Sequence, residues 1–137
     1  MRRVTGIGGV FFKASDPNNL REWYSKYLGI TASDENGTVF EWCADKHPEQ
    51  KGHTAWSIMS GSTRYFDPSK SPFILNYRVE NLAWLLEQLR REGVKVDDKV
   101  EEYKYGKFGW IFVPEGNKIE LWEPPKEFKW TGSIPME

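Results

Sequence analysis

The chain has 137 residues, of which 28% are charged and 15% aromatic, and its formal net charge is −1. This length fits a single domain with a sizeable core, and the balanced charge gives no sign of nucleic acid or an anionic membrane as a partner. No apolar run approaches the roughly 20 residues of a membrane span, and the first residues lack a secretory pattern. We therefore predict a cytoplasmic single-domain protein, residues 1–137, whose lone Cys43 forms no intramolecular disulfide.

The first half of the chain predicts a strand, a helix and three more strands. Residues 4–14 are rich in β-branched and aromatic side chains, which favours a strand. Asp16 supplies a capping oxygen and Gly29 a helix end, and between them the apolar residues recur at helical spacing: Leu20, Trp23, Tyr24, Tyr27 and Leu28. Short strands are then predicted at residues 30–32, 38–43 and 53–59, with residues 44–52 as a polar loop.

The second half repeats this order after a linker. Residues 60–72, SGSTRYFDPSKSP, are dense in Ser and Pro, but Tyr65 and Phe66 in this linker are expected to dock on the body. A strand at 73–79, a helix at 80–93 and three strands between residues 94 and 124 follow. The matching order predicts an internal duplication, with module one at about residues 4–60, module two at about 73–125 and a tail at about 126–137.

The last two predicted strands form a hairpin that contains one unusual carboxylate. The stretch YGKFGWIFVPEGNKIELWEP, residues 105–124, has a Pro-Glu-Gly-Asn turn in which Gly and Asn tolerate a positive φ. Glu120 lies between Ile119 and Leu121, so the period of two places its side chain on the opposite face from these apolar neighbours. Lys118 and Trp122 share the face of Glu120.

At this point the sequence resembles the vicinal oxygen chelate superfamily, which includes glyoxalase I, bleomycin-resistance proteins and extradiol dioxygenases. The resemblance rests on three passages, VFFKASDPNNLREWYSKYLGI at residues 10–30, ILNYRVENLAWLLEQLRREGV at 74–94 and GWIFVPEGNKIELWEP at 109–124. It implies an α+β fold in which two βαβββ modules form curled mixed sheets around a cleft that holds metal or ligand. Many members are dimers, so the resemblance also implies a homodimer.

The resemblance implies four metal-ligand positions, and only one of them carries a ligand in this chain. Glu120 occupies the family's glutamate position in the last strand. The first-strand positions of the two modules fall on Gly9 and Ile74, or on Phe73 if the register slips by one, and none of these side chains binds a metal. The remaining strand offers only His53 at its entry. We therefore predict no metal ligand set and no cofactor.

The strand phases predict which side chains line the cleft with Glu120. The first strand of module one turns Phe11 and Lys13 to the face opposite its helix. The first strand of module two does the same with Asn76 and Arg78. Arg78 is expected to come near Glu120. Three tryptophans, Trp56, Trp110 and Trp122, are candidates for apolar cleft walls, and the segment from Tyr105 to Gly109 is either a lip over the cleft or a bulged strand start.

These residues support three hypotheses of different classes. The first is metal-independent binding of a small organic molecule in an aromatic cleft. The second is a lyase or isomerase in which Glu120 acts as general base and Arg78 or Lys13 holds the developing anion, or in which Glu120 and His53 bind a divalent metal together with donors of a partner subunit. The third is a structural or regulatory dimer whose cleft is filled by its own side chains.

Overall fold

The structure is a computed structural model and describes residues 3–32, 37–44 and 47–126. In the first half these residues form β1 (Val4–Ala14), α1 (Pro17–Leu28), β2 (Thr38–Ala44) and β3 (His47–Ser60). In the second half they form β4 (Phe73–Val79), α2 (Leu82–Arg91), β5 (Lys95–Tyr103), β6 (Gly106–Phe112), the short 3-10 turn η1 (Pro114–Gly116) and β7 (Lys118–Glu123). Within the described part, neither helix is long and apolar enough to cross a membrane.

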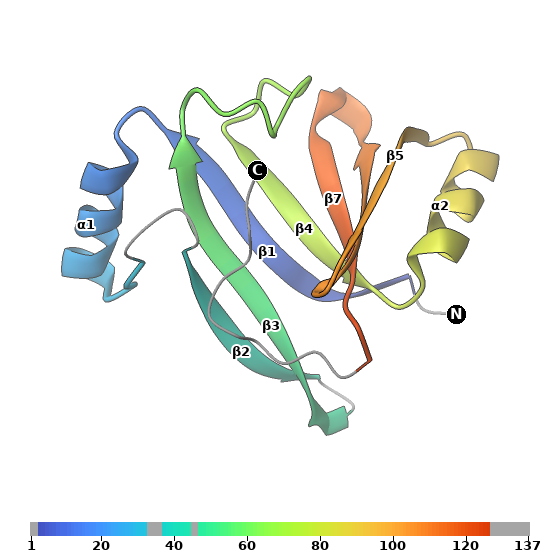
Figure 1. Ribbon diagram of the computed structural model, residues 1–137, viewed down its shortest axis with the longest axis horizontal. Helices are drawn as coiled ribbons and strands as arrows, with labels where there is room; N and C mark the ends of the chain where they lie inside the picture. The colour runs from blue at the N-terminus through green and yellow to red at the C-terminus, as the bar shows by residue number, and fades with distance from the viewer. Residues whose placement is uncertain (1–2, 33–36, 45–46, 127–137) are drawn as a thin grey trace.

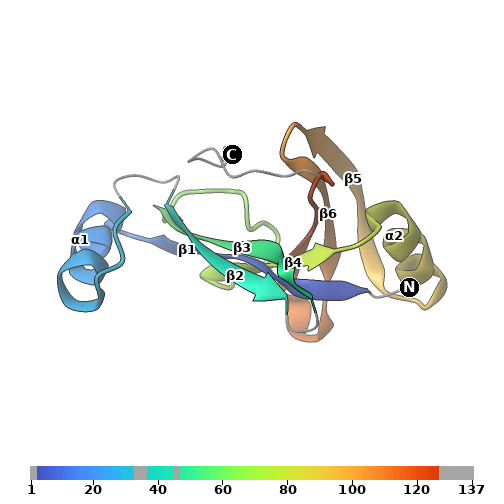
Figure 2. The same ribbon diagram turned by 90° about the horizontal axis from the view of Figure 1, so that it is seen from below.

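The strands form one open mixed sheet in the order β2-β3-β1-β4-β7-β6-β5. The helices lie at the two ends of the molecule, α1 beside β1 and β3 and α2 beside β5, β6 and β7 (Figure 1). Seen at right angles to that view, β5 and β6 stand steeply against the plane of β1, β2 and β3 (Figure 2). The predicted α+β class with a glyoxalase-like strand arrangement is thus confirmed, as a continuous open sheet.

Each half of the sheet is built on the same pairing pattern. The strand before the helix pairs in parallel with the last strand of its half, β1 with β3 and β4 with β7. The two halves then meet through the antiparallel pair β1 and β4, in which Val10 lies opposite Leu75 and Phe11 opposite Ile74. An internal duplication would produce this pattern, and it remains an inference from the sequence.

Two local predictions in the first half are wrong. Residues 30–32 form no strand. Instead, Ile30 and Ala32 pack against the cluster under α1. The loop predicted at residues 44–52 lies largely within β3, because β2 and β3 continue their pairing beyond Trp42 and Gly52. The polar composition of residues 44–52 shows no apolar alternation, so the sequence did not reveal this pairing.

The predicted helix boundaries follow from the caps. The Asp16 side chain accepts a hydrogen bond from the Asn19 N–H at 3.1 Å, and Asn81 accepts one from the Trp84 N–H at 3.0 Å. Gly29 ends α1 in the left-handed conformation, with φ 70°. Such caps satisfy backbone groups that helix ends leave unpaired, which is why short polar residues and glycine mark these positions.

The two faces of the sheet carry separate clusters of buried side chains. Both helices cover the same face, α1 over Phe12, Trp56 and Ile58 and α2 over Val79, Ile111 and Leu121. The opposite face carries a third cluster, which consists of Phe11, Ala55, Met59, Phe66, Ile74, Phe108, Trp110 and Trp122. No helix of the described residues packs on this open face, and Glu120 lies on it.

The turn before β7 differs from its predicted form in one residue. Val113 N–H donates to the Asn117 carbonyl at 3.0 Å and closes the reversal. Positive φ values fall on Glu115, at 76°, and Gly116, at 85°, while Asn117 has an ordinary φ of −72°. A non-glycine residue in this region carries a steric cost, so Glu115 is the strained member of the turn.

Candidate functional site

Glu120 is buried on the open face, with 2% of its surface exposed. Its neighbours in the sheet are Asn76 on β4 and Trp110 on β6. The Asn76 amide donates to one carboxyl oxygen, and the Trp110 indole N–H donates to the other at 3.1 Å. The Tyr65 hydroxyl also bonds to this second oxygen. Three donors from three different segments therefore converge on one buried carboxyl group.

The environment of Glu120 changes its protonation. Burial raises the pKa of this carboxyl from 4.5 to about 8, because the charged form loses the solvation of water. The group is therefore largely in the acid form at neutral pH. In that form it can donate its own proton to the Tyr65 oxygen, so the pair can pass a proton in either direction. A raised pKa inside a protein marks a candidate for proton transfer.

The segment of residues 61–72 brings Tyr65 to this carboxyl. Phe66 is fully buried in the cluster on the open face, which anchors the segment on the sheet. The Pro72 carbonyl accepts a hydrogen bond from the Lys13 N–H at 2.8 Å. The prediction that Tyr65 and Phe66 dock on the body is confirmed.

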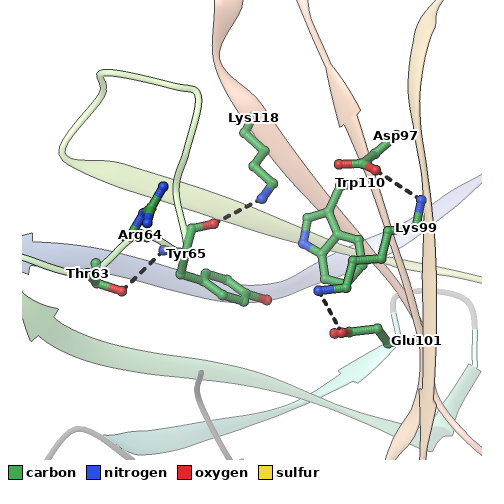
Figure 3. Close-up of a pocket in the computed structure, with 8 residues that line it drawn as sticks. All are labelled: Thr63, Arg64, Tyr65, Asp97, Lys99, Glu101, Trp110 and Lys118. Atoms are coloured by element: carbon green, nitrogen blue, oxygen red, sulfur yellow. Dashed lines mark hydrogen bonds and ion pairs between the residues drawn. The ribbon is translucent and has the colours of Figure 1, made fainter.

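A cavity of about 290 Å³ opens beside Tyr65 and Trp110. Three segments line it: residues 63–65, alternate residues of β5, and β6 with β7 (Figure 3). Its lining side chains are Thr63, Arg64, Tyr65, Asp97, Lys99, Glu101, Trp110 and Lys118. Glu120 does not line the cavity itself. It lies behind Tyr65 and Trp110, which both line the cavity and bond to the Glu120 carboxyl group.

The predicted site residues on the open face are partly brought together. Asn76 contacts Glu120 directly, and Trp110 both contacts Glu120 and lines the cavity. Phe11 and Trp122 lie in the cluster of the open face, outside the cavity lining. The phase argument thus places these four side chains on the correct face. Their roles toward a ligand stay predictions.

The two predicted cations lie elsewhere. Arg78 lies over the Trp42 ring, 5.9 Å from its centre, and its guanidinium donates to the Lys51 carbonyl at 3.5 Å. No contact joins Arg78 to Glu120 in the described residues, because Arg78 pairs with Trp122, two residues further along the parallel register. Burial lowers the pKa of Arg78. Lys13 lies over the Phe66 ring at 5.5 Å and therefore contacts the docked segment.

Trp56 and Tyr105 also depart from the predicted arrangement. Trp56 faces α1 and packs edge-on against Tyr24 at 5.0 Å, so it lies on the opposite face from Glu120. Its neighbours Ala55 and Met59 show the phase of β3, which the sequence did not reveal. Tyr105 stacks on Tyr103 at 5.1 Å, and its carbonyl accepts from the Trp122 indole at 2.8 Å. The segment after Tyr105 is the start of β6, which pairs with β5 and β7 in regular register there, without the bulge that one of the two alternatives included.

Sequence reasoning missed most of the cavity lining. Lys118 was placed on the face of Glu120 by its phase, but without a role. The alternate residues Asp97, Lys99 and Glu101 of β5 line the same cavity because β5 lies beside β6 at the sheet edge. The alternation of charge along β5 was a signal in the sequence. Only the strand order shows which neighbour this charged face meets.

The residues around Glu120 do not fit a metal ion. The Asn76 amide and the Trp110 indole direct N–H groups at the carboxyl, so in this arrangement only Tyr65 could add an oxygen lone pair, whereas a metal site needs several such donors. At Gly9, a Cβ atom would lie 2.5 Å from the Phe11 ring, so that position has no room for a ligating side chain. Within residues 3–32, 37–44 and 47–126, no three His, Cys, Asp or Glu side chains cluster as a metal site would require.

Solved structures with low sequence identity share this architecture. A methylmalonyl-CoA epimerase from Mycobacterium tuberculosis is 22% identical over 93% of this chain and 93% of its own, with a TM-score of 0.59. A glyoxalase/bleomycin resistance protein/dioxygenase superfamily member from Vibrio splendidus 12B01 is 12% identical over 85% of this chain and 97% of its own, with a TM-score of 0.55. The chain has the glyoxalase-like fold.

The predicted resemblance to the vicinal oxygen chelate superfamily is confirmed at the level of this fold. A Mn(II)-bound glyoxalase from Novosphingobium aromaticivorans is 18% identical over 90% of this chain and 40% of its own, with a TM-score of 0.56. No protein-family model matches the chain, and no curated protein matches its sequence. Because glyoxalase-like neighbours include both metal-bound proteins and epimerases, the fold alone does not select a reaction.

Proposed function

We propose that this glyoxalase-like protein binds a small organic molecule, without a metal, in the cavity beside Trp110. The observation that carries the proposal is the cavity of about 290 Å³ with an indole ring in its wall and charged groups around it. Ligand sites combine apolar area with a few polar groups that fix orientation, and their volumes usually begin at about 300 Å³. The cavity therefore suits a small ligand. An interior filled by its own side chains, as in the structural hypothesis, offers no such space.

Trp110 and Tyr65 supply the apolar area of this site. Trp110 is 4% exposed and is held by its hydrogen bond to Glu120, so its ring has a fixed orientation. Tyr65 packs edge-on against it, with ring centres 6.5 Å apart. A rigid aromatic wall binds planar apolar groups with little loss of side-chain entropy.

A fragment screen by protein-observed NMR tests this proposal. Fragments of up to about a dozen heavy atoms are expected to shift signals of residues around Trp110, with the same affinities before and after treatment with a chelator. The variant Trp110→Ala removes the aromatic wall and should abolish binding, whereas Trp23→Ala on the exposed side of α1 serves as the matched control. Tightly held stoichiometric metal whose removal abolishes binding would contradict the proposal.

A second candidate, proton transfer, is favoured by the Glu120 pKa of about 8 and by the position of Tyr65. In this reaction the ionised Glu120 takes the Tyr65 hydroxyl proton as the Tyr65 oxygen takes a proton from an acidic C–H of the substrate. The resulting carbanion is stabilised as its enolate by the ammonium of Lys118. After the enolate turns its other face to Tyr65, the Tyr65 hydroxyl returns a proton to the same carbon, Glu120 returns its proton to the Tyr65 oxygen, and the carbon centre is inverted. Lys118 thus replaces the Arg78 and Lys13 of the sequence hypothesis.

Deuterium exchange separates the two candidates. One structural neighbour is a Streptomyces coelicolor methylmalonyl-CoA epimerase in complex with 2-nitronate-propionyl-CoA, which suggests a methylmalonyl thioester as the first compound, in a short form without the CoA diphosphate. An isomerase incorporates solvent deuterium at C2, and both Glu120→Gln and Tyr65→Phe should slow this by about a hundredfold or more. A binder that lacks this chemistry leaves C2 unlabelled in every variant, with fragment binding retained.

We further propose that the protein is cytoplasmic, as its sequence pattern predicts, and that it forms a homodimer, as the resemblance implies. On α1, Trp23 is 48% exposed and Tyr27 and Leu28 are each 59% exposed, so this helix offers an apolar surface for a second copy to cover. Light scattering coupled to size-exclusion chromatography gives the mass directly. A monomer across micromolar concentrations would contradict the proposal.

A further inference from the structure

Lys118 has an unusual setting at the mouth of the cavity. Its ammonium is partly buried and lies over two aromatic rings, 5.5 Å from the centre of Tyr65 and 5.6 Å from that of Trp110. Its hydrogen-bond acceptor is the Tyr65 carbonyl, at 3.0 Å. Figure 3 shows this ammonium directed toward the docked segment and into the space above the two rings.

The other cations of the cavity already have carboxylate partners. Lys99 pairs with Glu101 at 2.9 Å, and Arg64 pairs with Asp67 at 3.4 Å. Lys118 forms no ion pair within the part of the chain that the structure describes. Burial lowers the pKa of Lys118, because its charge is held partly away from water, and the more distant carboxylates of Asp97, Asp67 and Glu101 offset this lowering only in part. An anion beside this ammonium would offset the remaining lowering.

The charges around the cavity also restrict how much negative charge it accepts. Asp97 and Glu101 line the same space and would repel a polyanion such as a diphosphate. A single carboxylate balances Lys118, which has no carboxylate at ion-pair distance among the described residues, while the indole of Trp110 contacts the remainder of the ligand. The small volume also limits the size of this remainder.

Building on the proposed function, we propose that the ligand of this cavity is a small organic monocarboxylate with a planar apolar body. Its carboxylate binds the ammonium of Lys118, and its apolar body packs on Trp110 and Tyr65. A charge-assisted hydrogen bond in a partly desolvated site is worth enough to separate a carboxylate from its neutral analogue by about tenfold or more in affinity.

The test compares three probes of one shape, namely benzoate, benzamide and benzylamine, by isothermal titration calorimetry and NMR. In the native protein, benzoate is expected to bind about tenfold more tightly than benzamide, with benzylamine weakest. In Lys118→Met, which keeps the apolar stem, benzoate should fall to the affinity of benzamide. Lys118→Arg restores the charge and should restore the preference. Lys26→Met is the matched control, because Lys26 also lies over an aromatic ring, 5.2 Å from Tyr27, but on α1.

The outcomes distinguish the two proposals. Equal affinities of the three probes in the native protein would overturn the carboxylate inference and leave the small-molecule site intact. An equal loss of benzoate and benzamide binding in Lys118→Met would assign Lys118 a structural role and overturn the inference as well. Failure of benzoate to bind at millimolar concentration overturns the inference, and failure of every neutral fragment also overturns the proposed function.

Discussion

The two halves of the sheet share a pairing pattern but carry different chemistry at matching positions. Phe11 and Asn76 occupy the same place relative to the capping residue of the following helix, and their parallel partners are Ser57 and Glu120. In the second half, an amide and a carboxyl group bond to each other. In the first half, a phenyl ring lies beside a hydroxyl group that has no hydrogen-bond partner among the described residues. The fold therefore accommodates either a Phe–Ser or an Asn–Glu pair at these equivalent strand positions.

This difference explains why the candidate site lies in one half only. A buried carboxyl group needs donors, and Asn76, Trp110 and Tyr65 provide them around Glu120. Phe11 cannot provide one for Ser57, so the first half contributes apolar packing to the open face. The glyoxalase-like scaffold supplies two equivalent places, and the side chains of a few positions decide which of them can bind or react.

The helix of the second half is also more completely buried against the sheet than the helix of the first half. α2 buries Leu82, Leu85 and Leu86 against the sheet. On α1, Leu20 and Tyr24 pack inward, but Trp23 is 48% exposed and Tyr27 and Leu28 are 59% exposed. The predicted apolar face of α1 is thus broader than the surface it covers in this chain. The second half is the better-packed support for a site.

The largest expected effect concerns Glu120 and pH. Its pKa is raised from 4.5 in the unfolded chain to about 8 in the fold, so folding favours the acid form. The stability that the protein gains from the raised pKa is fully present below pH 4.5, declines as the pH rises, and is lost above about pH 8. Denaturant titrations should show Glu120→Gln gaining relative stability across this window by about 1.4 kcal/mol per pH unit, or about 5 kcal/mol in total.

The equivalent position in the first half is the control for that experiment. Ser57→Ala removes a group that does not titrate, so its stability relative to the native protein should not change between pH 4.5 and 8. A pH-independent difference between Glu120→Gln and the native protein would mean that Glu120 keeps an ordinary pKa, and the contrast between the halves would lose its electrostatic basis.

The second prediction compares the helices. Leu86→Ala leaves a cavity beneath α2 and should reduce the free energy of unfolding by about 2–5 kcal/mol. Trp23→Ala removes a larger side chain that is half exposed on α1, and the expected loss is below about 1 kcal/mol. Chemical denaturation of both variants measures the difference. Equal losses would show that α1 is covered in solution, as a homodimer interface over this helix would cause.

The third prediction concerns the unpartnered hydroxyl of Ser57, which is 1% exposed. Ser57→Ala keeps the Cβ atom and removes a buried polar group that makes no hydrogen bond. The variant is expected to be more stable by about 1 kcal/mol, measured by urea denaturation at constant pH. A loss of stability would indicate that a water molecule or a second copy satisfies this hydroxyl group.

The smallest expected effect lies in the turn before β7, a feature of the second half. Glu115→Gly relieves the steric cost of a positive φ but adds freedom to the unfolded chain, for a net gain of about 0.5 kcal/mol in thermal or urea denaturation. Glu115→Asn, which tolerates this backbone, should give a similar gain. A loss in both variants would show that the Glu115 side chain makes a contact worth more than the strain.

Much of the framework around the site follows from local sequence. The alternation in residues 118–123 places Glu120 and Trp122 on one face. The cap at Asp16 and the spacing of the leucines after residue 80 locate the two helices, because these signals act within a few residues. The strand phases also place Asn76 on the face of Glu120, although the sequence predicted Arg78 rather than Asn76 as the neighbour of this carboxyl group.

The remainder depends on contacts between distant segments. Tyr65 bonds to Glu120 from a segment whose sequence is typical of a linker. Burial of the neighbouring Phe66 holds this segment on the sheet, and no sequence motif indicates that contact. Trp56 lies in a strand whose phase a single sequence did not determine, and a shift by one residue exchanges the faces. The position of Lys118 beside a cavity depends on β5 and on residues 61–72, which lie far from it in the sequence.

Trp110 has one more consequence, for spectroscopy. Its indole bonds to a carboxyl group that titrates near pH 8, and its ring lies within 6 Å of the ammonium groups of both Lys99 and Lys118. Indole emission responds to nearby charge, so proton loss from Glu120 and arrival of an anion at Lys118 should each change the fluorescence of this residue. A difference spectrum against Trp110→Phe isolates it from the other six tryptophans of the chain. The protein thus carries a native optical reporter between its buried acid and its cavity.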